Sequence, residues 1–127
     1  TFAVSWFGAV SINGLLKILF QRPRPVIFPP LVTTHSYSFP SGHTISAISF
    51  YGLTALFLWH RGHRTTAFLA GFWVFAVAFS RVYLGAHYPS DVVGALAAGG
   101  IWLILIWEGY LALKQRTDTD PELTGNG

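Results

Sequence analysis

Histidines and a carboxylate stand at spacings that suit proton transfer and nucleophilic attack. His43 follows Ser41 and Gly42 within the stretch 39–44, which opens an apolar run. A small-residue turn at the start of a helix presents free backbone N–H groups to an anion, and Gly42 lets the chain approach a ligand closely. An imidazole beside such a site can transfer a proton near neutral pH. Taken alone, the Ser-Gly-His triplet is explained as well by a turn with a helix N-cap.

A second histidine, His87, lies four residues before Asp91. This spacing is close to one helical turn if the last helix begins near His87. Asp91 would then accept a hydrogen bond from one ring nitrogen and leave the other free as a nucleophile, while His43 would protonate the leaving oxygen. The structural alternatives are a polar loop residue for His87 and an N-cap for Asp91, which could hold both roles.

Three cations, Lys17, Arg24 and Arg81, are expected on the same side of the molecule. Arg24 lies on a stiff segment, because Pro23 and Pro25 restrict their neighbours to extended geometry. Fixed cations repel one another, so a phosphate with several negative oxygens is the natural partner. Ionisable residues at a membrane boundary are costly and therefore indicate function. The alternatives are a snorkelling Lys17, a solvated Arg24 and an interfacial Arg81.

The composition is that of a membrane protein with one domain. Of the 127 residues, 52% are hydrophobic and 10% are charged, against about 25% charged in soluble domains. The net charge of +3 comes from scattered basic residues, which argues against nucleic-acid binding. The chain has no Cys, which excludes disulfides and thiolate zinc sites. It also has no Met, so we expect a fragment that lacks N-terminal helices.

The chain is expected to be all-α, a transmembrane bundle of four apolar helices. Apolar runs of about 20 residues are long enough to cross the hydrocarbon core. A transmembrane core over 1–113 is followed by a frayed polar tail over 114–127. The expected helices cover 2–20, 44–59, 65–80 and 91–113, with a proline-rich loop over 21–37 and a short loop over 81–90.

Alternating helix directions bring the segments before the second and fourth helices to one face. The opposite face carries four basic residues, Arg61, Arg64, Lys114 and Arg116. The first face also carries four basic residues. If the three cations named above take part in the reaction, only Arg22 remains to influence how the chain is oriented in the membrane. The positive-inside rule then predicts a cytoplasmic C-terminus and a candidate site that faces outward from a multi-pass protein of the cell membrane.

The ordered motifs resemble those of the type-2 phosphatidic acid phosphatase family, which also includes vanadium haloperoxidases and soluble bacterial acid phosphatases. The haloperoxidases are remote, since they are soluble. Membrane-bound members usually have six helices, so the resemblance implies that the first two are absent here. The matching motifs are Lys17 with Arg24-Pro25, Pro40-Ser41-Gly42-His43, and Ser80-Arg81 with His87 and Asp91.

The resemblance implies hydrolysis of a phosphomonoester or pyrophosphate without a metal or other cofactor. His87 would attack phosphorus to form a phosphohistidine, Asp91 would orient His87, and His43 would act as the general acid. The remaining motif residues would bind the phosphoryl oxygens: Lys17, Arg24, Ser41, Gly42 and Arg81.

The expected substrate is a lipid phosphate at the membrane surface, with no nucleic-acid partner. Undecaprenyl pyrophosphate ranks first, followed by phosphatidylglycerophosphate, phosphatidic acid or diacylglycerol pyrophosphate. One alternative is a metal-dependent hydrolase with His43, His87 and Asp91 as ligands, although the neighbouring cations would repel the ion. Another is a membrane protein that binds or transports lipid phosphates without turnover. His35 and His60, together with His63, are expected to be exposed loop residues without an assigned role.

Overall fold

The computed structural model describes residues 1–26 and 35–119, and this part of the chain is a bundle of helices. Three of the helices, α1, α4 and α5, are long and apolar enough to cross a membrane. The expectation of an all-α transmembrane bundle is therefore confirmed. The elements are α1 (Phe2–Phe20), α2 (Gly42–Ala47), the π-helical turn η1 (Ile48–Gly52), α3 (Leu53–His60), α4 (Arg64–Tyr83) and α5 (Pro89–Thr119).

The second expected helix is interrupted near its middle by the π turn η1. It also begins at Gly42, two residues earlier than expected. The hydroxyls of Ser49 and Thr54 donate to backbone carbonyls four residues earlier, at 3.0 and 2.7 Å. Hydroxyl-to-carbonyl bonds of this kind compete with the backbone ladder and bend helices. Ser49 lies within the π turn, and the bond from Thr54 ends on the carbonyl of Phe50 within it.

The last two helices are longer than the apolar pattern predicts. Helix α4 continues to Tyr83, so Arg81 lies in its last turn and not in a loop. Helix α5 continues through Thr119, so the polar segment expected to fray is helical up to that residue, while 120–127 lie outside the described residues. The hydroxyls of Thr117 and Thr119 donate to carbonyls four residues earlier. Arg116 in the last turn suits the negative end of the helix dipole.

The core lies where α1, α2 and α5 meet, around the buried residues Ala9, Ile45 and Ala95. Small residues let helix backbones approach closely in a membrane. At Gly8 an added Cβ would lie 2.0 Å from the ring of Trp102, so α1 and α5 could not keep this contact with a larger residue. The Trp102 indole donates to a backbone carbonyl of α1 at 2.8 Å. Helix α2 is central because it packs against α1, α4 and α5.

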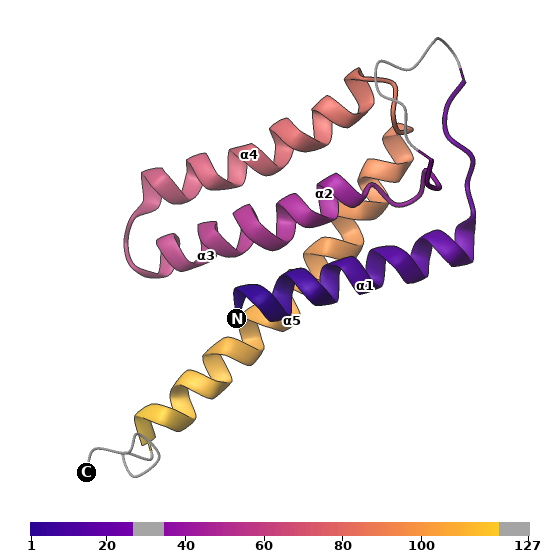
Figure 1. The fold of residues 1–127 in the computed structure, drawn as a ribbon. Helices are drawn as coiled ribbons and strands as arrows, with labels where there is room; N and C mark the ends of the chain where they lie inside the picture. The colour runs from indigo at the N-terminus through magenta and orange to yellow at the C-terminus, as the bar shows by residue number, and fades with distance from the viewer. Residues whose placement is uncertain (27–34, 120–127) are drawn as a thin grey trace.

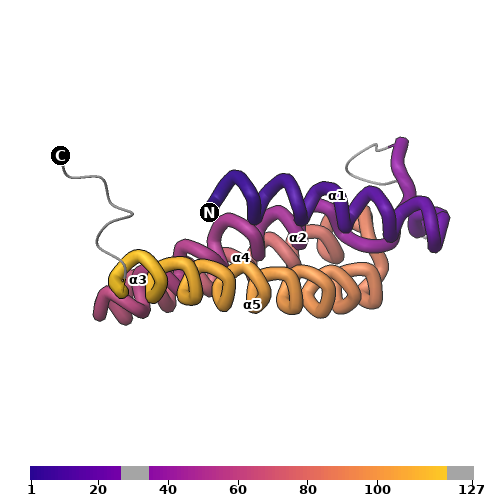
Figure 2. The backbone as a smooth tube through the Cα atoms, turned by 90° about the horizontal axis from the view of Figure 1, so that it is seen from below, coloured from indigo at the N-terminus to yellow at the C-terminus, as the bar shows by residue number. Residues whose placement is uncertain are grey.

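The helices bring distant segments of the chain together at one end of the bundle. Figure 1 shows that the C-terminal end of α1, the start of α2, the end of α4 and the start of α5 gather there. We call this the site end. The turn between α3 and α4 and the C-terminal part of α5 lie at the opposite end, which we call the far end. Figure 2 shows α1 and α5 along two edges of the bundle, with α2 between them.

Candidate active site

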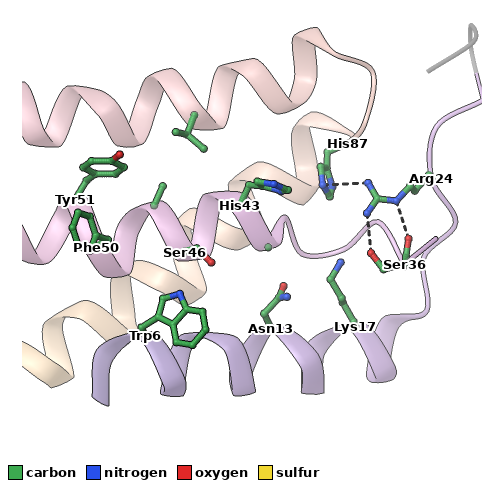
Figure 3. A pocket seen from close by; sticks show the side chains of 13 residues that line it. Trp6, Asn13, Lys17, Arg24, Ser36, His43, Ser46, Phe50, Tyr51 and His87 are labelled. Carbon is green, nitrogen blue, oxygen red and sulfur yellow. Dashed lines mark hydrogen bonds between the residues drawn. The ribbon is translucent and has the colours of Figure 1, made fainter. Parts of the chain in front are cut away.

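A cavity of about 620 Å³ opens between α1, the helix formed by α2 and η1, and α4. Figure 3 shows its polar side chains at the site end and its aromatic side chains farther along the helices. The cavity therefore has one charged end and one apolar end. The polar lining comprises Asn13, Lys17, Arg24, Ser36, Gly42, His43, Ser46 and His87, and the apolar lining comprises Trp6, Ala47, Phe50, Tyr51 and Val77.

Backbone carbonyls hold the two cations of the polar end in place. Lys17 donates to the carbonyl of Tyr37 at 2.5 Å. Arg24 donates to both the carbonyl and the hydroxyl of Ser36, at 2.8 and 3.0 Å, and to the carbonyl of Ala86 at 2.8 Å. Burial lowers the pKa of Arg24 from its ordinary value, and the charge of Asp91 opposes this shift. Since carbonyls carry no full charge, both cations keep a positive charge that can act on an anion in the cavity.

The imidazole of His87 is buried and faces the cavity with one nitrogen. Its Nδ1 lies 2.8 Å from the carbonyl oxygen of Ser38, and its Nε2 lies 3.4 Å from Nη1 of Arg24. A carbonyl only accepts hydrogen bonds and a guanidinium only donates them, so the ring proton sits on Nδ1 and Nε2 carries the lone pair. Burial, followed by the charge of Arg24, lowers the pKa of His87 to about 4. The ring is therefore neutral at neutral pH.

Asp91 is fully buried and lies in a network that differs from the expected direct pairing with His87. One carboxylate oxygen, Oδ2, accepts from the backbone N–H of Tyr88 at 2.8 Å and from the hydroxyl of Ser38. The distance from His87 Nδ1 to this oxygen is 3.5 Å, longer than the 2.8 Å from His87 Nδ1 to the Ser38 carbonyl. The ring proton is thus directed at Ser38 and not at Asp91.

The start of α5 explains this difference. The helix begins at Pro89, the first-turn position that proline favours. His87 therefore lies outside the helix, and Asp91 is its third residue rather than the N-cap that was the structural alternative for it. From that position the carboxylate reaches back to the N–H of Tyr88, as the acidic residue of a capping box does. Asp91 caps the helix and holds the Ser38 segment at the same time.

Arg22 belongs to the site, although the sequence analysis considered it only as a charge that affects orientation in the membrane. Its Nη1 donates to Asp91 Oδ1 at 2.9 Å and to the hydroxyl of Ser90 at 2.6 Å. Its guanidinium also stacks over the ring of Tyr88, 4.2 Å from the ring centroid. Proline spacing could have indicated this role, because residues two apart in an extended segment point the same way. By that argument Arg22 should accompany Arg24.

The motif around Gly42 and His43 contributes to the cavity unevenly. Both residues line it, but Ser41 is fully buried behind the wall and its hydroxyl accepts a hydrogen bond from Thr44 at 3.0 Å. Ser41 is the N-cap residue of α2 by position, without a side-chain capping bond. Arg81 does not line the cavity, yet it is close enough for its charge to act on His43.

Asn13 is a polar cavity residue that the sequence did not single out. It lies one turn before Lys17 on α1. Its Oδ1 is buried and has no hydrogen-bond partner within the described part of the chain. A Cβ at position 42 would lie 3.1 Å from Asn13 Nδ2, so Gly42 permits α2 to approach α1 here. The amide therefore lies at the border between the charged and apolar ends of the cavity.

The remaining histidines do not line the cavity. His35, His60 and His63 are exposed, as expected, although His60 is the last residue of α3 and its ring faces Trp107 at a centroid distance of 5.7 Å.

The zinc alternative needs three convergent ligands. Across residues 1–26 and 35–119, no three His, Asp or Glu side chains form a group that could hold a metal ion.

Comparison with known proteins identifies one family. A sequence model of the PAP2 superfamily matches residues 1–114. Phosphatidylglycerophosphatase B of Bacillus subtilis is 38% identical over 75% of this chain and 49% of its own length. Lipid A 1-phosphatase of Rhizobium etli is 36% identical over 81% of this chain and 50% of its own. Human dolichyldiphosphatase 1 is 32% identical over 93% of this chain and 58% of its own length.

A solved structure is also similar. The crystal structure of the first transmembrane PAP2-type phosphatidylglycerolphosphate phosphatase from Bacillus subtilis matches with a TM-score of 0.75 and 34% identity, over 86% of this chain and 56% of that one. The chain spans about half the length of the curated relatives it matches. The family model covers most of the chain, and the similar solved structure has the same fold. The chain belongs to the PAP2 superfamily.

Proposed function

We propose that this chain forms the catalytic core of an integral-membrane phosphatase that hydrolyses a lipid phosphate or pyrophosphate through a phosphohistidine on His87. The observation that carries the proposal is the state of the His87 ring. Its Nδ1 proton is directed at a carbonyl, and its Nε2 lone pair lies in the cavity beside Arg24. A neutral imidazole next to fixed positive charge suits attack on an anionic phosphoryl group.

The shape and polarity of the cavity support a lipid substrate. The charged end would take the phosphoryl group, while Trp6, Phe50 and Tyr51 would contact the hydrocarbon chain. Between the two ends, Asn13 would accept a hydrogen bond from a hydroxyl of the lipid near its phosphate. The relatives are named for phosphatidylglycerophosphate, lipid A and dolichyl diphosphate. We rank a polyprenyl pyrophosphate such as undecaprenyl pyrophosphate first, then phosphatidylglycerophosphate and phosphatidic acid.

The reaction proceeds in two displacements. Lys17 and Arg24 bind the phosphoryl oxygens, with Arg81 as an outer charge, and Gly42 and Ser41 shape the adjoining wall. His87 Nε2 attacks phosphorus, the bond to the leaving oxygen breaks, and His43 gives that oxygen a proton. Water then attacks the phosphohistidine while His43 accepts its proton, which releases phosphate and restores neutral His87. Electrostatic stabilisation of the transferring group supplies most of the catalysis, without a metal ion.

The distribution of charge supports an orientation in the membrane. Arg22 and Arg24 are both engaged at the site end. At the far end, Arg61 and Arg64 are exposed, as are Lys114 and Arg116. The positive-inside rule then places the far end and the C-terminus in the cytoplasm, and the site at the outer surface. The transmembrane core is assigned to 1–113, followed by a polar cytoplasmic segment.

The test is phosphate release from a panel of lipid phosphates in detergent, with a chelator present. His87→Ala should lower release by at least about a thousandfold, because the nucleophile is removed. His63→Ala removes an exposed histidine at the far end and is the matched control, with activity expected to stay at the parent level. Release that survives His87→Ala would overturn the assigned nucleophile. Lipid binding without any turnover in the folded parent would favour a binding or transport protein.

A further inference from the structure

Ser38 is hydrogen-bonded to three residues of the site, Arg22, His87 and Asp91. It is fully buried and lies just before the Pro40-Ser41-Gly42-His43 motif. Its hydroxyl donates to Asp91 Oδ2, and its carbonyl accepts from His87 Nδ1 at 2.8 Å. Its backbone N–H donates to the carbonyl of Arg22 at 2.7 Å. All three polar groups of this one residue are therefore used within the site.

These bonds form a closed ring of three residues, Ser38, Asp91 and Arg22. Arg22 donates through Nη1 to Asp91 Oδ1 at 2.9 Å, which completes the circuit from Ser38 through Asp91 back to Arg22. The ring joins the segment after α1, the segment before α2 and the first turn of α5. His87 is attached to this ring through the Ser38 carbonyl.

We infer that Ser38 is a positioning residue that holds His87 in its nucleophilic tautomer, and that Asp91 acts on His87 through Ser38. The inference rests on the proposed function and deepens it. The Ser38 carbonyl accepts the Nδ1 proton and so keeps Nε2 free. The hydroxyl of Ser38, bound to Asp91, fixes the position of that carbonyl.

Physical chemistry favours this order of contacts. A hydroxyl bound to a carboxylate is a charge-assisted hydrogen bond, which is roughly twice as strong as a neutral one. Arg22 provides the charge that a buried carboxylate requires. By contrast, the distance of 3.5 Å between His87 Nδ1 and Asp91 Oδ2 is long for a hydrogen bond. The rigid part of the site is therefore the pairing of Ser38 with Asp91.

The kinetic test compares Ser38→Ala and Ser38→Cys with the parent chain. Cys keeps the volume of Ser but is a weak donor. We expect kcat to fall by about 10- to 100-fold in both variants, with KM changed by less than about threefold, because a hydrogen bond to a buried charge is lost. Ser49→Ala removes an equally buried hydroxyl that donates within its own helix, and is the control. Parent-like kcat in Ser38→Cys would overturn the inference, since packing alone would then explain the residue.

The second readout does not need activity. With ¹⁵N-labelled histidine, NMR shows which ring nitrogen of His87 carries the proton, and His87→Gln identifies the signal. The parent should be protonated on Nδ1, and Ser38→Ala should move part of the population to Nε2. A parent protonated on Nε2 would overturn the inference whether or not the variants fold. If no lipid phosphate is hydrolysed, the proposed function fails while the tautomer still decides the role of Ser38.

Discussion

The two ends of the bundle use opposite kinds of contact, although the same helices run through both. At the site end, Asp91 is fully buried among directional hydrogen bonds from Arg22 and Ser38. At the far end, Phe57 packs its ring against Trp107 and Tyr110 at centroid distances of 5.3 and 4.8 Å. Aromatic side chains are common where helices meet the membrane surface. The far end is therefore stabilised by contact between apolar surfaces, which does not require exact placement of individual atoms.

The two ends differ in how exactly their side chains must be placed. A buried charge is tolerated only with well-placed partners, so the site end is sensitive to the loss of one atom. Stacked rings can shift by fractions of an ångström and keep most of their contact, as can the Arg64 guanidinium, which lies 5.4 Å from the centroid of the Trp59 ring. Substitutions matched between the two ends should therefore differ in their effects.

The largest difference is expected between Arg24→Gln and Arg64→Gln. Arg24 lies at the charged end of the cavity beside His87. Its removal should lower kcat/KM by about 10²- to 10³-fold, the cost of losing a fixed electrostatic group. Arg64→Gln removes the same charge at the far end and should change kcat/KM by less than about twofold. Steady-state phosphate release measures both, and equal losses would show that the two ends do not differ in this way.

A smaller difference is expected in stability. Arg22→Gln leaves Asp91 without its cation and should lower the free energy of unfolding by about 1–3 kcal/mol, below the range for a fully buried pair because Arg22 is partly exposed. At the far end, Arg64→Gln removes an exposed cation–π contact and should cost about 0.5–1 kcal/mol. Denaturant unfolding in detergent micelles compares the two. An Arg22 variant as stable as the Arg64 variant would contradict the importance of the buried network.

The smallest effect concerns pH. His87 is nucleophilic only when neutral, so activity falls as the pH drops through its pKa of about 4. Between pH 5 and 7 the neutral fraction should therefore change by only about a tenth. Arg24→Gln removes a charge that lowers this pKa, so the pKa should rise. NMR titration of the His87 ring gives both values, and a pKa in Arg24→Gln that is equal to or below that of the parent would contradict the role of Arg24.

Hydrophobic runs and motif order were sufficient to predict the helical bundle and the family. The details of the site were less accessible, because they depend on where segments meet in space. The His87–Asp91 spacing predicted a direct bond on the assumption of a helix that starts near His87, but α5 starts at Pro89. Ser38 is an ordinary loop serine in the sequence. Its three contacts arise from residues 16 to 53 positions away, which no local pattern encodes.

The π turn over Ile48–Gly52 lies between these two ends. A π turn holds about one residue more than an α-turn, so side chains beyond it are rotated by roughly 100° relative to an unbroken α-helix. His43 before the turn lines the cavity, while Phe57 beyond it meets the rings of α5. The turn thus determines the directions in which side chains of the second half of this helix point, independently of those in the first half. Deleting one residue there would re-aim Phe57 and leave His43 in place.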